Sequence, residues 1–348
     1  MQLLKVNVGI DISKDNFVAT VATINTEFEI DYQATRKFDN NASGFEQFYQ
    51  WTEKKCPKGL ELHFTMEATG VYYENLAYFL IERTRNVYVL LPIVAKKYFD
   101  SLNTKSKTDK IDSKLLARLG LERKLKAWAV HSDIFRRMRR LTREHEHLQK
   151  QKTMASNQLH ALKHSHKPDK KSIARYERLI ETLEDLLKEV EKEMEKLYKE
   201  EPEVKEKLKK VMSIPGVSLT TAMTVIAETN GFATFTNAKQ VVSYAGLDVR
   251  VRESGKYKGQ ARITKKGNRH IRRALYMPAI SHKIHSTKGA QFYERISQRK
   301  SSNLIAITAL ERKLLILIYS LWKKQEYYDP NYEQNKRQKQ NKTAKNKK

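Results

Sequence analysis

A long heptad pattern in the middle of the chain constrains the fold more than any other feature. Mostly apolar residues recur at steps of three and four from Ile134 to Leu162, with His145 and Lys152 in the series, and apolar residues recur without a miss from Ile173 to Leu197. A spacing sustained over this length is typical of coiled-coil helices. The pattern breaks around Pro168, so we predict two helices of about 30 residues that form an antiparallel hairpin about 45 Å long. This hairpin would occupy residues 131–205, either as a structural spacer or as an arm for dimerisation or RNA binding.

Residues 1–130, before the hairpin, have the pattern of an α/β domain. Leu4, Val6, Val8 and Ile10 alternate with other residues, as expected for a strand with one buried face. Further β-rich runs lie at 17–24, 28–32, 62–66 and 87–91, and helical patterns lie at 40–55 and 72–85. Strands followed by alternating helices and strands predict a mixed sheet.

Residues 206–330, after the hairpin, predict a mainly α-helical domain. Small residues are frequent there, a loop with glycines lies at 246–259, and a last apolar helix spans 303–324. We predict a disordered basic tail at 331–348, because residues 336–348 contain seven Lys and Arg and no acid.

The charge balance restricts the class of partner. The chain has 67 Lys and Arg against 40 Asp and Glu, a net charge of +27, which attracts phosphate polymers or anionic membranes. The longest aliphatic stretch, 314–322, is less than half of the roughly 20 residues that a membrane-spanning helix needs. A single cysteine, Cys56, excludes an internal disulfide and a Cys-based zinc site. The first residues lack the pattern of a signal peptide, so we expect a soluble, cytoplasmic, nucleic-acid-binding protein.

Four acids are candidates for a metal site. Asp11 closes the first predicted strand, Glu67 closes a later one, and Asp109 and Asp112 are three apart on a predicted helix. Strand-end carboxylates of an α/β sheet gather at one edge. Carboxylate oxygens suit Mg²⁺, and two such ions can activate a nucleophile at a phosphodiester. An acid of this kind taken alone usually marks a turn or a helix cap, so the metal site is predicted from the four acids together on a chain this basic.

The C-terminal region holds a second group of candidates. Ile214-Pro-Gly-Val-Ser resembles a helix–hairpin–helix turn, in which Gly216 would present backbone N–H groups to a phosphate, or it is an ordinary helical turn. Further on, Ser254-Gly lies among many cationic residues. Those that we expect to bind nucleic acid, with Gly216, are Arg250, Arg252, Lys256, Lys265, Lys266 and Arg269. From the residues alone, Ser254 belongs to a flexible turn that contacts DNA.

A pair of histidines has the spacing of metal ligands. His160 and His164 are four apart on a predicted helix, but the sequence provides no third ligand nearby. We interpret them as surface or RNA-contacting residues.

Several motifs together resemble one known family. Gly9-Ile-Asp-Ile-Ser-Lys, Met66-Glu-Ala-Thr-Gly-Val-Tyr-Tyr and Lys107-Thr-Asp-Lys-Ile-Asp are similar to the acidic motifs of the DEDD transposases of the insertion-sequence one-ten and eleven-eleven families. Tyr244-Ala-Gly-Leu, Glu253-Ser-Gly-Lys and Ile263-Thr-Lys-Lys-Gly-Asn are similar to the domain that follows the acidic one in that family. One departure is Val249, where the family often has proline.

The resemblance implies a fold, a site and an activity. It implies an RNase H/RuvC-like domain at 1–130, with Mg²⁺ bound by Asp11, Glu67, Asp109 and Asp112, and a catalytic serine at Ser254 in a transposase domain at 206–330. The implied activity is RNA-guided excision and insertion of a mobile DNA element through a phosphoserine intermediate. Homodimers would assemble into tetramers, with the acids and the serine of one site coming from different subunits. The implied location is the bacterial cytoplasm, in association with the nucleoid.

Three alternatives stay open from the sequence. A site-specific DNA invertase shares these motifs. A RuvC-like nuclease would use metal-activated water and would need the four acids but not Ser254. A non-enzymatic nucleic-acid-binding protein would need neither.

Overall fold

The protein divides into two compact units, residues 1–130 and 131–348. The computed structural model describes residues 2–335 except 84, 85, 104, 105, 107, 251, 252, 256, 260, 261, 300, 301, 333 and 334, and leaves the side chains of 257 and 258 undescribed. The predicted disordered tail therefore lies, for 336–348, outside the described residues. None of the described helices combines the length and apolar composition needed to cross a bilayer.

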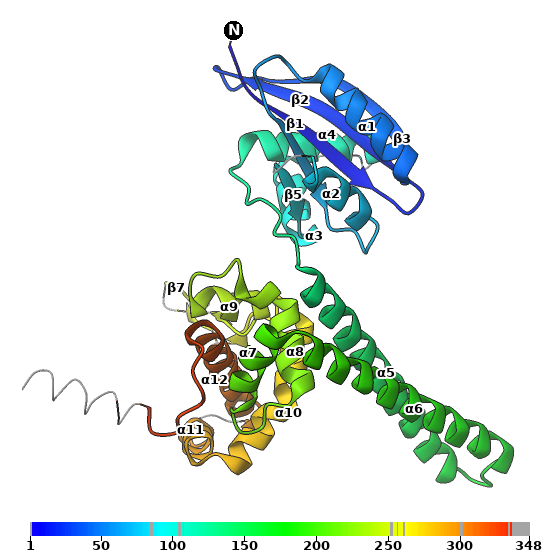
Figure 1. The fold of residues 1–348 in the computed structure, drawn as a ribbon, viewed down its shortest axis with the longest axis vertical. Coiled ribbons are helices and arrows are strands. Elements are labelled where there is room, and N and C mark those ends of the chain that lie inside the picture. Colours follow the sequence, from blue (N-terminus) through cyan, green and yellow to red (C-terminus); the bar gives the residue numbers. More distant parts are fainter. Residues whose placement is uncertain are drawn as a thin grey trace, which may run out of the picture. The chain divides into compact units, whose positions relative to one another are not determined.

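The first unit is built on the predicted mixed sheet, whose strand order is β3-β2-β1-β4-β5 (Figure 1). The strands are β1 (Leu3–Ile12), β2 (Asn16–Asn25), β3 (Ile30–Asp39), β4 (Leu62–Glu67) and β5 (Val87–Leu90). The first three form an antiparallel meander, while β4 runs parallel to both β1 and β5. The carboxyl ends of β1 and β4 therefore lie at the same edge.

Helices cover both faces of this sheet (Figure 1). They are α1 (Ala42–Lys55), α2 (Glu74–Ile81), α3 (Pro92–Ser101) and α4 (Asp109–Glu122). On one face, Val8 and Ile10 pack with Phe48 of α1 in an aromatic core. On the other face, Ala117 of α4 packs with Ala22 and Ile24 of β2. The helix α3 departs from the sequence prediction, because Pro92 is the first residue of a helix as well as the residue after a strand, and proline suits that first position.

The second unit begins with the predicted helical hairpin. Its arms are α5 (Asp133–Lys163) and α6 (Lys170–Glu200), and the heptad positions Leu183, Leu187 and Val190 of α6 are buried. Ion pairs from Lys152 to Glu184 at 2.8 Å and from Lys163 to Glu177 at 2.7 Å also join the two arms. The root of the hairpin shares a core with the helices that follow.

The helices that follow are α7 (Pro202–Met212), α8 (Leu219–Glu228), α9 (Ala238–Ala245), α10 (Arg269–His285), α11 (Thr287–Ser297) and α12 (Asn303–Lys324). The last of them has the predicted bounds. The predicted loop at 246–259 differs from expectation, because short antiparallel pairs form within 249–263. They join β6 (Val249–Arg250) to β9 (Arg262–Ile263) and β7 (Glu253–Ser254) to β8 (Tyr257–Lys258). We call residues 249–263 the serine ribbon.

Candidate active site

Alternation along β1 and β4 puts two of the four candidate acids on the same face of the sheet. The last parallel pair joins Ile10 to Met66, so Asp11 and Glu67 are each the next residue along neighbouring strands. Since side chains alternate between faces, Asp11 shares the face of Asn7 and Gly9. That face is covered by α4, because the Asn7 side chain donates to the Ala117 carbonyl oxygen at 2.9 Å. Both acids are half-buried.

The other two acids lie in the first turn of α4, which runs antiparallel to β1. Along β1, Lys5 contacts Gly120, Asn7 contacts Ala117, and Gly9 lies against Ser113. The same alignment carries the first turn of α4 to the end of β1, where Asp11 stands. Asp109 is exposed and Asp112 is half-buried, and Thr108 caps the helix by accepting the amide of Ile111.

The four acids are thus drawn to one edge of the sheet without closing around a common point. Among the described residues, no three His, Cys, Asp or Glu side chains come close enough to hold one metal ion. The donor set nevertheless fits a hard divalent cation, because it consists of carboxylates that can each offer one or two oxygens.

Asn40 was missed by the sequence interpretation and joins the loops that follow both strand-end acids. Its side-chain amide lies 2.9 Å from the Ser13 carbonyl oxygen, 3.3 Å from that of Lys14 and 3.1 Å from that of Tyr72. Ser13 and Lys14 come just after Asp11, and Tyr72 follows Glu67. Asn40 thereby fixes the two loops relative to each other.

The second unit places Ser254 at the end of the serine ribbon. Ser254 is exposed, and the next residue, Gly255, has a φ of 56°, which glycine adopts without strain. Exposed cations surround the ribbon: Arg250, Lys265, Lys266 and Arg269 are exposed, whereas Arg252 and Lys256 lie outside the described residues.

The base of the ribbon is held by a close backbone contact. The amide of Lys265 donates to the Gly246 carbonyl oxygen at 3.1 Å, and that of Thr264 donates to Asp248 at 2.9 Å. A Cβ on Gly267 would lie 2.4 Å from the Tyr244 carbonyl oxygen, so only glycine permits this approach. Arg272 donates to the Ala245 and Gly267 carbonyl oxygens at 2.7 and 3.2 Å, so it supports the base of the ribbon from below.

The predicted hairpin turn between α7 and α8 packs on α10. Gly216 has a φ of 91°, and a Cβ there would lie 2.9 Å from the Pro278 carbonyl oxygen. The His282 ring Nδ1 is 2.8 Å from the Pro215 carbonyl oxygen and adds a second link. The phosphate-binding role of Gly216 stays a prediction.

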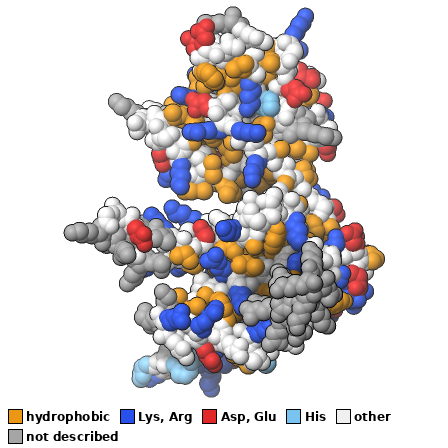
Figure 2. All heavy atoms as spheres, turned by 90° about the vertical axis from the view of Figure 1, so that its left-hand side faces the viewer, with side chains coloured by type: hydrophobic (Ala, Val, Ile, Leu, Met, Phe, Trp, Pro, Cys, Tyr) orange, Lys and Arg blue, Asp and Glu red, His pale blue; other side chains and the backbone are white. Residues whose placement is uncertain are grey.

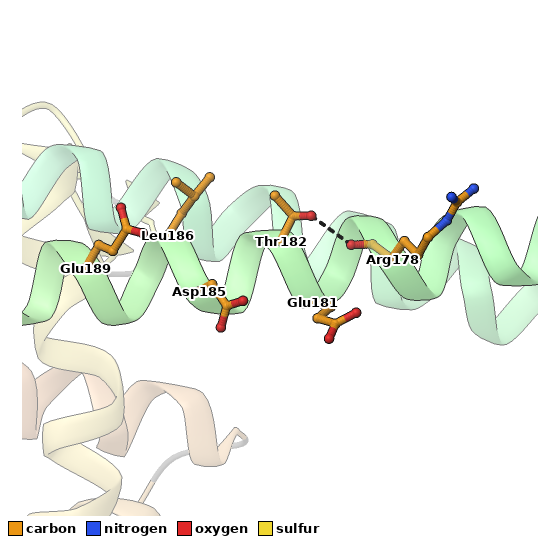
Figure 3. A pocket seen from close by; sticks show the side chains of 6 residues that line it. All are labelled: Arg178, Glu181, Thr182, Asp185, Leu186 and Glu189. Carbon is orange, nitrogen blue, oxygen red and sulfur yellow. Dashed lines mark hydrogen bonds between the residues drawn. The ribbon is translucent and has the colours of Figure 1, made fainter.

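The helical hairpin carries two further features of interest. The rings of His160 and His164 are 4.2 Å apart at its exposed tip. Along α6, outside the buried seam, Figure 3 shows a shallow groove lined by Arg178, Glu181, Thr182, Asp185, Leu186 and Glu189. Its three acids would repel a phosphate backbone, so this face of α6 is unsuited to nucleic acid.

The first unit thus has an acidic sheet edge, and the second has a basic ribbon with an exposed serine. Residues 8–168 match the DEDD transposase family of IS110 elements, and residues 208–294 match the transposase IS116/IS110/IS902 family. The chain belongs to this IS110 family of transposases and is a DNA recombinase or transposase. Membership of this family indicates that the enzyme uses a divalent metal.

The chain is similar to pilin gene-inverting proteins and to proteins of insertion elements. The chain is 29% identical over 330 residues to the pilin gene-inverting protein of Moraxella lacunata, covering 93% of this chain and 98% of that one. It is 28% identical to the same protein of Moraxella bovis, with the same coverage. A 43.6 kDa protein of insertion element IS110 from Streptomyces coelicolor is 24% identical over 34% of this chain and 29% of its own length. A solved Ppx/GppA family member from Aquifex aeolicus aligns with 27% of this chain and 37% of its own at 14% identity and a TM-score of 0.20, too low to indicate a shared fold.

Proposed function

We propose that this enzyme excises and inserts an insertion-sequence element by attack of Ser254 on a DNA phosphodiester, assisted by Mg²⁺ held at Asp11, Glu67, Asp109 and Asp112. The observation that carries the proposal is the alignment of the acidic edge: two neighbouring parallel strands end in acids on the face covered by α4, whose first turn holds the other two. A basic protein that concentrates carboxylates at one edge gains from a cation there.

The first unit has, in this proposal, an RNase H/RuvC-like fold. A mixed sheet in which an antiparallel meander continues into two parallel strands supports it, as does the position of the acids at the carboxyl ends of β1 and β4. When bound, Mg²⁺ would supply charge neutralisation at the phosphate and make a hydroxyl group easier to deprotonate.

The proposed reaction consists of two successive transesterifications at Ser254. Arg250, Lys265 and Lys266 hold the scissile phosphate beside Ser254, which removes the entropic cost of meeting it in solution. The Ser254 hydroxyl loses its proton to a base, its oxygen bonds to phosphorus, and the deoxyribose oxygen leaves and takes up a proton. A hydroxyl of the new DNA partner then attacks the phosphoserine, releasing Ser254 and rejoining the strand.

Partners of the proposed reaction are DNA, an element-encoded guide RNA and further copies of the chain. On the face shown in Figure 2, Lys and Arg side chains lie among hydrophobic and acidic ones, and these cations can neutralise phosphates of a nucleic acid. Homodimers would assemble into tetramers, with the acids and Ser254 of one site supplied by different copies. The acidic groove of α6 directs RNA to other faces of the hairpin.

A second candidate function is site-specific DNA inversion. The pilin gene-inverting proteins of two Moraxella species align with 93% of this chain, whereas the IS110 protein aligns with 34%. The two functions share the chemistry and differ in the arrangement of the DNA ends. A plasmid carrying the element ends as direct or as inverted copies separates them, because an invertase yields inverted product from the second plasmid and no excised circle from the first.

Covalent trapping tests the proposed chemistry. The protein is produced with the DNA that flanks its gene, supplied with Mg²⁺ and junction DNA, denatured, and searched for protein-linked DNA by gel and peptide mass spectrometry. An adduct on Ser254 is expected in the wild type and in the control Ser243→Ala, whose serine is also exposed. The adduct should be absent from Ser254→Ala and reduced at least about 100-fold in Asp11→Asn. Undiminished cleavage by Ser254→Ala would refute the serine step and support the water-using nuclease.

A further inference from the structure

A buried carboxylate joins three parts of the C-terminal unit beneath the serine ribbon. Glu228, the last residue of α8, has a fully buried side chain. Its Oε1 accepts from Arg143 Nε of α5 at 2.6 Å, and its Oε2 accepts from Arg143 Nη2 at 3.1 Å. The same Oε2 accepts from Asn268 Nδ2, just before α10, at 2.6 Å.

The carboxylate is ionised and set in a surplus of positive charge. Burial by itself would raise the pKa of Glu228, but the hydrogen bond from Arg143 and the charges of Arg139 and Arg143 outweigh it and hold that pKa below its ordinary value. Arg139 Nε is 3.6 Å from Oε2 and, among the described residues, is buried without a hydrogen-bond partner. Buried ion pairs rarely add stability over apolar residues of the same size, and their best-attested use is to specify one arrangement.

The arrangement specified here is the base of the serine ribbon. Asn268 uses its amide nitrogen on Glu228 and its amide oxygen to accept the backbone N–H of His270 and of Ile271, at 2.9 and 3.2 Å. Its own backbone N–H donates to the Tyr244 carbonyl oxygen at 2.7 Å. The Tyr244 hydroxyl completes this hydrogen-bond network by donating to the Glu228 carbonyl oxygen at 3.1 Å.

We propose that Glu228 is a positioning residue for the reaction at Ser254: it fixes Asn268, and with it the base of the serine ribbon, against the root of α5. The ribbon leaves this base after Asp248 and returns to it at Thr264, so a displacement of Asn268 moves the segment that bears Lys265 and Lys266. The inference rests on the proposed function, in which Ser254 attacks DNA.

The hydrogen bond from Asn268 to Glu228 can be tested by exchanging its donor and acceptor, because the double variant should restore what each single variant loses. In Glu228→Gln, the new amide turns its oxygen to Arg143 and its N–H to the amide N–H of Asn268, so the two donors oppose each other. In Asn268→Asp, two carboxylates face each other, although aspartate still caps α10. In the double variant, which combines Glu228→Gln with Asn268→Asp, the contact between the two side chains is restored with donor and acceptor exchanged. Its total charge equals that of the wild type.

Two readouts are needed: amide hydrogen exchange at residues 265, 268, 270 and 271, and the rate of DNA strand cleavage at saturating DNA. In each single variant, exchange at these amides should be about tenfold faster and cleavage about tenfold slower, with DNA affinity changed less than about threefold. The double variant should recover most of both. The matched control is Glu146→Gln, which breaks the contacts of α5 with His270 and Arg273 but leaves Asn268 untouched. It should not alter exchange at residues 265 and 268.

The outcomes separate this inference from the proposed chemistry. Wild-type exchange in both single variants, or no recovery in the double variant, overturns the positioning role. If Glu228→Gln does not fold, comparing Asn268→Asp with the double variant still tests whether the two side chains act through their mutual contact. Cleavage by the wild type without a Ser254 adduct refutes only the serine step. The exchange and cleavage rates of the variants then still test the positioning role of Glu228.

Discussion

At the residue scale, Glu311 is a buried acid whose titration depends on the fold. It lies on α12 with 6% of its surface exposed. Burial raises the pKa of Glu311 to about 7 from its ordinary 4.5, although the positive charge of Arg272 acts in the opposite direction. Between these two pH values the folded protein holds a proton that the unfolded chain has lost. The stability that Glu311 contributes is therefore present below about pH 4.5 and is lost as the pH rises towards 7.

Replacing Glu311 with Gln should remove this pH dependence. At about 1.4 kcal/mol per pKa unit, the advantage of Glu311→Gln over the wild type should be larger at pH 8 than at pH 5 by about 2–3 kcal/mol. This corresponds to several degrees in the Tm of the C-terminal unit. Thermal unfolding at both pH values measures it, and curves of Tm against pH that run parallel for the two proteins would contradict it.

Whether a residue of the candidate site could be predicted from the sequence depends on how far apart in the chain its signal extends. Asp11 and Glu67 were found because each ends an alternating or apolar run, a signal contained within a few residues. Glu228 gives no such signal, since its partner Arg143 is 85 residues away and the pairing exists only after α5 and α8 pack. The same holds for Asn40, whose acceptor at Tyr72 lies 32 residues further along.

At the element scale, the acidic edge depends on the close approach of α4 to β1. A Cβ on Gly9 would lie 2.1 Å from both the Ala117 backbone nitrogen and the Ser113 carbonyl oxygen, so no side chain fits there. The helix can approach the strand this closely only because residue 9 is glycine, and its first turn carries Asp109 and Asp112.

Gly9→Ala should therefore push α4 off the sheet. The expected cost is about 3 kcal/mol or more of unfolding free energy, because backbone rather than a flexible side chain must move. DNA cleavage should fall with it, as the α4 acids shift from the strand-end acids. Chemical denaturation and cleavage assays measure the two effects. Gly59→Ala is the control, since its φ of 84° brings strain but no atom lies within 4 Å of the added Cβ. It should cost about 1–2 kcal/mol, and a Gly9→Ala protein no less stable than this control would contradict the argument.

Elements were predictable where their signal is local and long. The two 31-residue arms of the hairpin follow from heptads that repeat many times. The two-residue strands of the serine ribbon could not be predicted, because so short a strand has no periodicity and is defined only by its pairing partner. The helix α3 was missed because Pro92 ends one element and begins the next.

At the scale of the whole molecule, the excess positive charge belongs almost entirely to one unit. Residues 1–130 have 19 Lys and Arg against 16 Asp and Glu, whereas residues 131–348 have 48 against 24. Within the second unit, residues 249–273 contain ten Lys and Arg and one acid, and residues 336–348 contain seven and none. The charge balance therefore favours the C-terminal unit for binding the phosphate backbone, and in the proposed function the carboxylates of the nearly neutral first unit hold the metal.

Replacing the seven Lys and Arg of 336–348 with Gln should weaken DNA binding in a salt-dependent manner. Each cation that neutralises a phosphate releases a counterion, so the slope of log K against log salt should become shallower by up to about 6, at ~0.9 per lost contact. Fluorescence anisotropy over a KCl series measures the slope. Changing Lys188 and Lys192 of α6 to Gln is the control, because acids flank both and neutralise their field. An equal change in slope per removed charge in both sets would mean that total charge, rather than its position in the chain, governs binding. A slope unchanged by the seven substitutions would leave the serine ribbon as the main phosphate-binding segment, with DNA held where Ser254 can reach it.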